Sequence, residues 1–192
     1  MSDNFTMKHH LGSLRLYDES ANTPSDIWEH VPILYMYAAT ASHVTEFGTS
    51  RGNSTAAFLL ARPNSIRAYD VVKNPRVSRI ENAAKDAGVD FKFIKHDILE
   101  LTDIEETDIL FIDSLHVHDQ MKHELGFSHR VMKHIIMHDT DAFGVRGERK
   151  GFGGGIWPAV GDFIRRDPKW QIGQIIRSNN GLVILNRISG EA

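Results

Sequence analysis

Between residues 43 and 140, short runs rich in β-branched and aromatic residues alternate with longer stretches whose apolar positions recur at helical spacing. The short runs predict strands at 43–48, 65–72, 91–97, 108–113 and 134–140. The longer stretches predict helices at 53–62, 75–88 and 117–132. This alternation is typical of an α/β fold, in which helices cover both faces of a parallel sheet.

The pattern changes after residue 140. Residues 144–160 are rich in glycine and carry several basic residues, which predicts a loop that enters a helix near 157–164. Residues 170–187 predict two strands joined by Ser-Asn-Asn-Gly, a strong hairpin signal. Upstream, residues 25–41 predict one or two amphipathic helices, with Pro32 near a helix start. We therefore expect a doubly wound, seven-stranded, mostly parallel sheet with a C-terminal antiparallel hairpin.

The composition narrows the kinds of chemistry and partner. The chain has 192 residues, of which 41% are hydrophobic, and this fits a single compact domain. Because it has no cysteine, any metal must be held by oxygen or imidazole ligands. The formal net charge of −3 argues against nucleic-acid binding, and no apolar run is long enough to span a bilayer. We expect a cytoplasmic protein that contacts neither nucleic acid nor membrane; a homo-oligomer stays open.

Two glycines, Gly48 and Gly52, lie between the first predicted strand and the next helix. Glycines there permit a tight turn and let a ligand approach the backbone at a helix N-terminus. The spacing is not the dinucleotide motif G-x-G-x-x-G, because Ser50 replaces the middle glycine. Carboxylates at successive strand ends favour an adenosine-type ligand at this edge, although a plain turn with surface acids is the structural alternative. These carboxylates are Glu46, Asp70 and Asp97.

Here the sequence resembles a known family. Residues 46–52, Glu-Phe-Gly-Thr-Ser-Arg-Gly, are similar to the first motif of class I S-adenosylmethionine-dependent methyltransferases, which have a Rossmann-like, seven-stranded sheet. The segments SDIWEH, FIDSLH, HDT and GGIWPAV resemble a small-molecule O-methyltransferase branch related to metal-assisted sugar, macrolide and catechol enzymes. The resemblance divides a single domain, 1–192, into an N-terminal helical cap segment (1–42), a cofactor-binding half (43–140), a Gly-rich lid loop (141–157) and the last helix with the hairpin (158–192).

The resemblance implies that S-adenosylmethionine is the cofactor. Gly48 and Gly52 would approach its methionine part, with Glu46 near the ammonium group. Asp70 would bind the ribose hydroxyls and Asp97 the adenine amino group. The implied cofactor-binding residues, with Val71 and Ile98 packing on the two adenine faces, are Glu46, Gly48, Thr49, Ser50, Gly52, Asp70, Val71, Asp97, Ile98 and Asp113.

A polar cluster follows the fourth predicted strand, in the stretch ILFIDSLHVHDQ at 109–120. Asp113 ends this strand, and Asp139 has the equivalent place after the fifth. Two carboxylates on adjacent strand ends are spaced to share a hard divalent cation such as Mg²⁺. In the metal-dependent relatives a third Asp or Asn completes the site. The resemblance implies the ligand set Asp113, Asp139 and Asp141; His116 as the third ligand, or a site without a third ligand, are the alternatives.

Methyl transfer to a hydroxyl requires that the hydroxyl lose its proton. A cation promotes this loss by lowering the pKa of the alcohol, and a histidine does so as a general base. His116 and His138 are the candidate bases, so the predicted catalytic residues are Asp113, His116 and His138. The structural alternative for each histidine is a hydrogen bond to a loop backbone.

The predicted function is transfer of a methyl group to a hydroxyl of a small, sugar-like molecule, with divalent-metal assistance. Arg146, Arg149 and Lys150 in the Gly-rich segment could meet an anionic or polyhydroxyl acceptor such as a nucleotide sugar. Two alternatives stay open. One is a non-catalytic nucleotide- or metal-binding domain, and the other is a metal-dependent hydrolase that uses Asp113, His116, His138 and Asp139.

Overall fold

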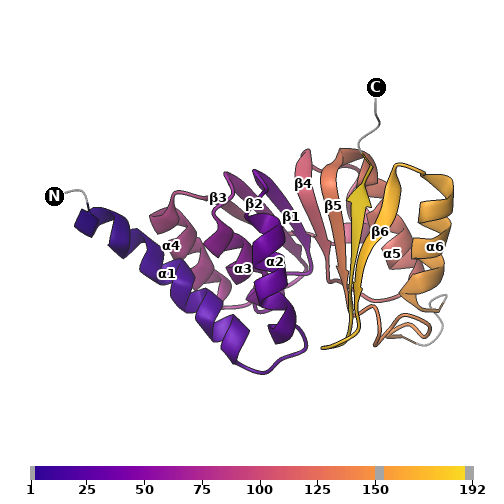
Figure 1. Cartoon of the computed structure of the whole chain (residues 1–192), viewed down its shortest axis with the longest axis horizontal. Coiled ribbons are helices and arrows are strands. Elements are labelled where there is room, and N and C mark those ends of the chain that lie inside the picture. Colours follow the sequence, from indigo (N-terminus) through magenta and orange to yellow (C-terminus); the bar gives the residue numbers. More distant parts are fainter. Residues whose placement is uncertain (1–2, 150–153, 189–192) are drawn as a thin grey trace.

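The computed structural model describes residues 3–149 and 154–188 and contains one seven-stranded sheet (Figure 1). The strand order is β3-β2-β1-β4-β5-β7-β6, in which β1 to β5 pair in parallel and β7 pairs antiparallel with both neighbours. This arrangement confirms the predicted α/β fold with a C-terminal antiparallel hairpin. The strands are β1 His43–Phe47, β2 Ser65–Asp70, β3 Asp90–Lys95, β4 Thr107–Ile112, β5 Val131–His138, β6 Trp170–Ile176 and β7 Leu182–Arg187.

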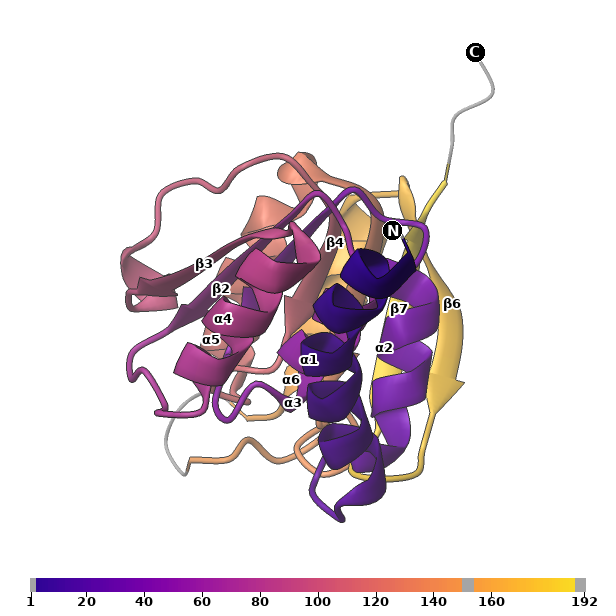
Figure 2. The same cartoon turned by 90° about the vertical axis from the view of Figure 1, so that its left-hand side faces the viewer.

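Helices cover both faces of the sheet, with α1 to α4 on one face and α5 and α6 on the other (Figures 1 and 2). Leu16 and Phe58 belong to a buried cluster beneath the first group. Met121 and Phe163 belong to a second cluster on the opposite face. The helices in the described ranges are α1 Asp3–Asn22, α2 Val31–Ala38, α3 Asn53–Ala61, α4 Val77–Ala87, α5 His118–Leu125 and α6 Ile156–Arg166.

The segment after β4 differs from the prediction of one helix over 117–132, and that prediction was wrong at its C-terminal end. Helix α5 ends at Leu125, a 3-10 helix follows over Gly126–Arg130, and β5 begins at Val131 rather than at 134. Glycine has a low helix propensity, so Gly126 is a natural end for α5. Val131 is fully buried and pairs with Thr107 of β4, so burial and strand pairing stabilise the extended backbone there.

Helix α1 lies within the segment expected to be helical, but the hydrophobic pattern predicted helices only over 25–41. Its inner side carries the small residues Ser13 and Ser20, both buried, together with Leu16. A Cβ on Gly12 would lie 3.3 Å from the Cβ of Ala83 in α4, so the two helices pack closely. Because small and polar residues form most of this inner side, the helical periodicity of apolar residues is weak in the sequence.

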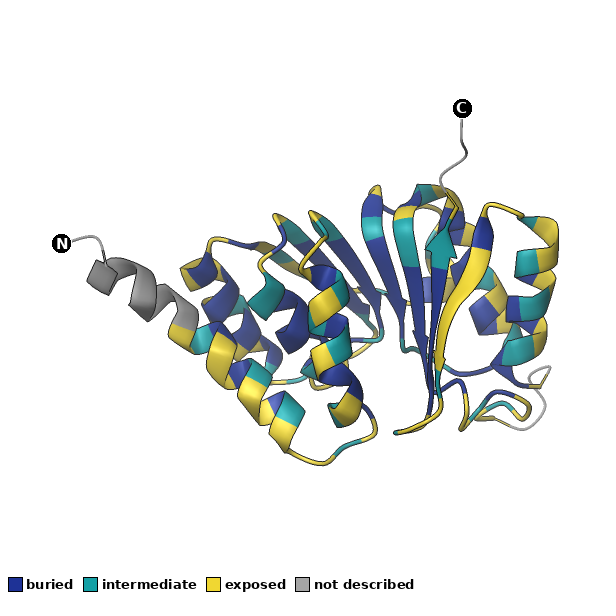
Figure 3. Ribbon diagram, viewed as in Figure 1, coloured by how far each residue is buried: buried dark blue, intermediate teal, exposed yellow. Residues whose placement is uncertain are grey.

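The sheet register brings the ends of β1, β4 and β5 side by side. Phe47 pairs with Ile112 and Ile112 with Met137, so the next residues, Gly48 and Asp113, meet at one edge together with the end of β5. Figure 3 shows that the strands are mostly buried between the helices, whereas the edge strand β6 is exposed. Within residues 3–149 and 154–188, the helices are too short or too polar to cross a membrane.

Candidate functional site

The loop after β1 is shaped by a close approach between Gly48 and the end of β4. Gly48 has a φ of +85°, and a Cβ there would lie 2.0 Å from the carbonyl oxygen of Asp113. A side chain cannot fit at that distance, and a positive φ also disfavours non-glycine residues. Gly48 therefore lets the backbones of two neighbouring strand ends meet at the carboxyl edge of the sheet.

Asp70, at the end of β2, holds the next part of this loop. Its Oδ2 accepts a hydrogen bond from the backbone N–H of Ser50 at 2.7 Å, and its Oδ1 accepts one from Val72 at 3.0 Å. Ser50 has a φ of +46°, a conformation that non-glycine residues seldom adopt. The hydrogen bond from the Ser50 N–H to Asp70 stabilises this turn, which explains how the loop tolerates serine in place of the middle glycine.

A cavity of about 520 Å³ lies above these strand ends. This volume falls within the range of small-molecule binding sites. The cavity continues to the described part of the Gly-rich segment, where Glu148 and Arg149 line it. Seven of the expected cofactor-binding residues line it: Gly48, Ser50, Asp70, Val71, Asp97, Ile98 and Asp113.

The other three expected residues, Glu46, Thr49 and Gly52, do not line this cavity. Glu46 is fully buried, and its carboxylate accepts hydrogen bonds from the hydroxyls of Ser54 and Thr55 at the start of α3. Burial raises the pKa of Glu46 to about 8, although the two hydroxyls oppose the shift. Thr49 is buried as well, and its hydroxyl donates to the carbonyl of Tyr69. Glu46 and Thr49 thus support the loop from beneath.

Asp113, His116 and Asp139 form a compact group beside the cavity. Among the described residues, one ligand atom from each lies within 4.8 Å of the other two, a spacing that a single cation can bridge. His116 Nε2 and Asp139 Oδ1 are buried and have no hydrogen-bond partner among the described residues, although Asp139 Oδ1 lies 3.2 Å from His138 Nδ1 as an ion pair. Nε2 lies 3.3 Å from Asp113 Oδ1, but the two are not aligned for a hydrogen bond. A buried imidazole nitrogen without a partner is unfavourable, so Nε2 beside two carboxylates fits a bound cation.

His138 joins Asp113 to the turn between β6 and β7. Its Nδ1 lies 3.1 Å from Asp113 Oδ1 and its Nε2 lies 3.3 Å from the carbonyl oxygen of Asn179. Both neighbours are acceptors, so both ring nitrogens can donate only in the imidazolium form. Burial alone would lower the pKa of His138, but the charge of Asp113 and the hydrogen bond to it raise the pKa to about 9.

Asp141 lies outside the group of Asp113, His116 and Asp139. Its carboxylate pairs with Arg177 at 3.1 Å, and its backbone N–H donates to Asn180. The backbone at Asp139 has a φ of +59°, which turns the chain away from the strand direction. The structure therefore brings His116, rather than Asp141, to the two strand-end aspartates.

Three buried or loop residues near the site were not predicted from the sequence. His30 is fully buried, packs edge to face on His138 with ring centroids 5.3 Å apart, and has a pKa lowered to about 4 by burial and by the charge of His138. Glu124 is buried on α5, bonds to Ser114, and has a pKa raised to about 7 by burial. Glu148 reaches back from the Gly-rich segment to His116.

Of these three residues, only Glu124 could have been found from the sequence. Its i, i+4 spacing from Gln120 places both polar side chains on one side of the same helix. His30 and Glu148 reach the site through tertiary contacts. Of the three basic residues expected at an acceptor, Arg149 lines the cavity and Arg146 is exposed, whereas Lys150 lies outside the described residues.

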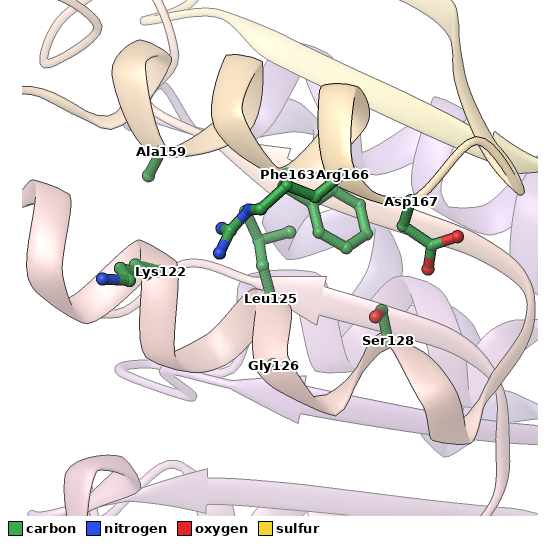
Figure 4. Close-up of a pocket in the computed structure, with 8 residues that line it drawn as sticks. All are labelled: Lys122, Leu125, Gly126, Ser128, Ala159, Phe163, Arg166 and Asp167. Carbon is green, nitrogen blue, oxygen red and sulfur yellow. The ribbon is translucent and has the colours of Figure 1, made fainter.

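A second hollow, of about 270 Å³, lies between the C-terminal halves of α5 and α6 (Figure 4). The side chains of Leu125 and Phe163 form its apolar wall, and Lys122 and Arg166 flank it. None of the strand-end residues described above lines this hollow. This hollow is therefore separate from the carboxyl edge of the sheet.

Known proteins with a similar fold were found among solved structures. No family model matches the chain, and no curated protein matches its sequence. Solved structures do match. A predicted O-methyltransferase from Klebsiella pneumoniae is 16% identical with a TM-score of 0.63, and the alignment covers 97% of this chain and 96% of that one.

Two further matches were solved with ligands. The Burkholderia thailandensis 1,6-didemethyltoxoflavin-N1-methyltransferase, with bound 1,6-didemethyltoxoflavin and S-adenosylhomocysteine, is 15% identical with a TM-score of 0.61, covering 98% and 92% of the two chains. The N-terminal domain of EvdMO1, in the presence of S-adenosylhomocysteine and D-fucose, is 14% identical with a TM-score of 0.57, covering 86% and 84%. At these identities the likeness shows the fold, which is the Rossmann-like fold of methyltransferases.

Proposed function

We propose that this protein is an S-adenosylmethionine-dependent O-methyltransferase that acts on a small molecule with the help of a divalent cation. The observation that carries the proposal is the position of Asp113, which lines the cavity above the Gly48 loop and also belongs to the group with His116 and Asp139. A cofactor in that cavity and a cation at that group would therefore be neighbours.

The residues around the cavity fit an adenosine-containing cofactor. Each carboxylate oxygen of Asp70 has a second lone pair beyond its backbone hydrogen bond, so Asp70 can also accept from two ribose hydroxyls. Val71 is 54% exposed, which leaves an apolar side chain free to pack on a flat base. Asp97 caps the turn at Leu99 and stays available to an amino group. Glu46 supports the loop through Ser54 and Thr55, and we assign it no direct contact with the cofactor.

The group at the end of β4 and β5 fits a hard cation. We propose Mg²⁺, held by Asp113, Asp139 and His116, since two of these three ligands are carboxylates; imidazole as the third ligand also suits Mn²⁺. When bound, the cation would lower the pKa of an acceptor hydroxyl. Asp141 was the third ligand expected from the resemblance, and its ion pair with Arg177 makes it a weaker candidate than His116.

We assign His138 the role of positioning Asp113. A general base must offer a free lone pair, and both ring nitrogens of His138 already face acceptors. His116 Nε2 has no hydrogen-bond partner among the described residues, so its lone pair can serve as the third ligand of the cation or, without the cation, as the base, but not as both at once. Proton removal is thus proposed to depend on the group of Asp113, His116 and Asp139.

The acceptor is proposed to be a small polyhydroxyl compound. D-fucose accompanies S-adenosylhomocysteine in one matching structure, and 1,6-didemethyltoxoflavin does so in another. Arg149 and Glu148 add charged groups to the cavity wall, which favours a polar or anionic molecule such as a nucleotide sugar.

The experiment that tests this function uses S-adenosylmethionine with an isotopically labelled methyl group. The purified full chain and Mg²⁺ would be incubated with pools of sugars, nucleotide sugars and catechols. We expect label in a product that disappears when Asp113 is changed to Asn. Binding of S-adenosylhomocysteine without labelled product from any pool would favour the non-catalytic binding domain, and hydrolysis that needs no cofactor would favour the hydrolase.

A further inference from the structure

The described part of the Gly-rich segment holds His116 from two directions. The backbone N–H of Glu148 donates to the carbonyl oxygen of His116 at 2.9 Å. The Glu148 carboxylate Oε2 in turn accepts from the backbone N–H of His116 at 3.3 Å and lies 3.4 Å from its ring Nδ1. Phe143 stacks on the His116 ring, with centroids 5.2 Å apart and planes inclined by 16°. The ring is therefore fixed at one edge and one face.

These contacts give the two ring nitrogens of His116 different surroundings. Nδ1 faces the carboxylates of Glu148 and Asp139, whereas Nε2 faces Asp113 without an aligned hydrogen bond. A histidine that binds a cation is neutral and carries its proton on the other ring nitrogen, and the acceptors opposite Nδ1 favour the proton there. The lone pair of Nε2 is then directed toward Asp113, an arrangement that a positive ion between the two atoms would stabilise.

We propose that Glu148 is a positioning residue for the cation site, which sets the tautomer and orientation of His116 so that Nε2 completes the ligand set of Asp113 and Asp139. This inference rests on the cation part of the proposed function. Histidine ligands of metals commonly donate their second N–H to a carboxylate, and loss of that carboxylate weakens metal binding. Glu148 itself lies outside the group whose ligand atoms are within 4.8 Å of one another, so it acts through His116.

Glu148 also connects the proposed cation site with the cofactor cavity. Glu148 lines that cavity and contacts the third proposed ligand of the cation. A single side chain on the Gly-rich segment thus touches both parts of the site. This contact could not be predicted from the sequence, because 32 residues separate Glu148 from His116.

The test measures Mn²⁺ binding to the full chain by calorimetry and electron paramagnetic resonance. Glu148→Ala should weaken binding by about 10- to 100-fold. Glu148→Gln should give a smaller loss, because the amide oxygen can still accept from Nδ1. Two control variants should bind Mn²⁺ with an affinity within about threefold of that of the wild type, since changes at exposed surface positions contribute little. Val145→Ala shortens an 82% exposed side chain in the same segment, and Asp119→Asn removes one exposed negative charge.

A second readout follows the tautomer of His116 by long-range ¹H–¹⁵N NMR with Mg²⁺ bound, and His116→Gln assigns the signal. We expect the proton on Nδ1 in the wild type and a change in this pattern for Glu148→Ala. Mn²⁺ binding by Glu148→Ala and Glu148→Gln as tight as by the wild type would overturn the inference and leave the cation site standing. A wild-type chain that binds no Mn²⁺ would overturn both, while cofactor binding remains a separate test of the methyltransferase.

Discussion

His138 Nδ1 lies 3.1 Å from Asp113 Oδ1, and this contact joins the ends of the neighbouring strands β5 and β4. With its Nε2 facing the carbonyl oxygen of Asn179, His138 also links the sheet edge to the β6–β7 turn. The pair is charged, with His138 buried and Asp113 partly buried, so it both stabilises this edge and orients the carboxylate that we assign to the cation. The contact between His138 and Asp113 therefore contributes both to the stability of the fold and to the proposed chemistry.

We predict that His138→Gln lowers the free energy of unfolding by about 2 kcal/mol, because a charge-assisted hydrogen bond between a buried imidazolium and a partly buried carboxylate is lost. The matched control is His134→Gln on the same strand. His134 is half-buried and bonds to Asn186, away from the site, so its replacement should have an effect of less than about 1 kcal/mol. Urea unfolding measures both values. Equal losses for the two variants would contradict the special role of the His138–Asp113 pair.

Gly48→Ala should be strongly destabilising and should abolish cofactor binding. The added Cβ would lie 2.0 Å from the carbonyl oxygen of Asp113, at a φ of +85°. The left-handed backbone conformation costs an alanine about 1–2 kcal/mol, and the clash with the backbone adds about 1–3 kcal/mol. Gly88→Ala is the control, because Gly88 has a similar φ of +72° but nothing lies within 4 Å of its added Cβ. Thermal and urea unfolding that gave the same loss for both variants would show that no clash occurs at Gly48.

The unfolding free energy should depend on the ionisation of Glu46. Burial raises the pKa of Glu46 to about 8 in the folded protein, compared with about 4.3 in an unfolded chain. The folded state therefore binds this proton more tightly, and its stabilising effect is complete below pH ~4 and lost as the pH rises through about 8.

Between pH 6 and pH 9, the wild type should lose about 2–3 kcal/mol more of its unfolding free energy than Glu46→Gln, which cannot ionise. The comparison is made by urea unfolding without cofactor. Parallel pH profiles for the two proteins would mean that Glu46 is already ionised near neutral pH in the folded state.

The third cation ligand can be decided by two substitutions. His116→Gln should weaken Mn²⁺ binding by more than about tenfold, because it removes a ligand atom. Asp141→Asn should leave Mn²⁺ affinity within about threefold, because Asp141 pairs with Arg177 outside the group. Calorimetry on the full chain provides both affinities. The opposite order would restore Asp141 as the ligand and remove His116 from the site.

The fold could be predicted from the sequence because, over residues 43 to 140, the hydrophobic pattern of each segment agrees with the way the strands pair in the sheet. Strands such as Thr107–Ile112 end in continuous apolar runs, here residues 109–112, and polar residues follow them at one edge. Parallel pairing then places Asp70 and Asp113 at the same edge, as expected from the sequence. Helix α1 was not located, because buried Ser13 and Ser20 take positions that apolar residues would mark.

The site was less predictable than the sheet, because its details depend on backbone direction after the strands end. At Asp139 the left-handed backbone turns Asp141 toward Arg177, and sequence spacing carries no sign of that turn. His30 and Glu148 reach the site across long sequence separations. The residues on the strand ends could be proposed from the pattern, whereas those contributed by loops required the tertiary structure.

Calorimetry with S-adenosylhomocysteine, in the presence of a chelator, tests the central claim most directly, because it separates cofactor binding from the cation. We predict saturable one-to-one binding at submillimolar concentration. Asp70→Asn should weaken it by about tenfold or more through loss of charge-assisted hydrogen bonds to the ribose. Asp86→Asn, at an exposed position on α4, should leave it unchanged. No binding of S-adenosylhomocysteine or S-adenosylmethionine at near-millimolar concentration would contradict the proposed function.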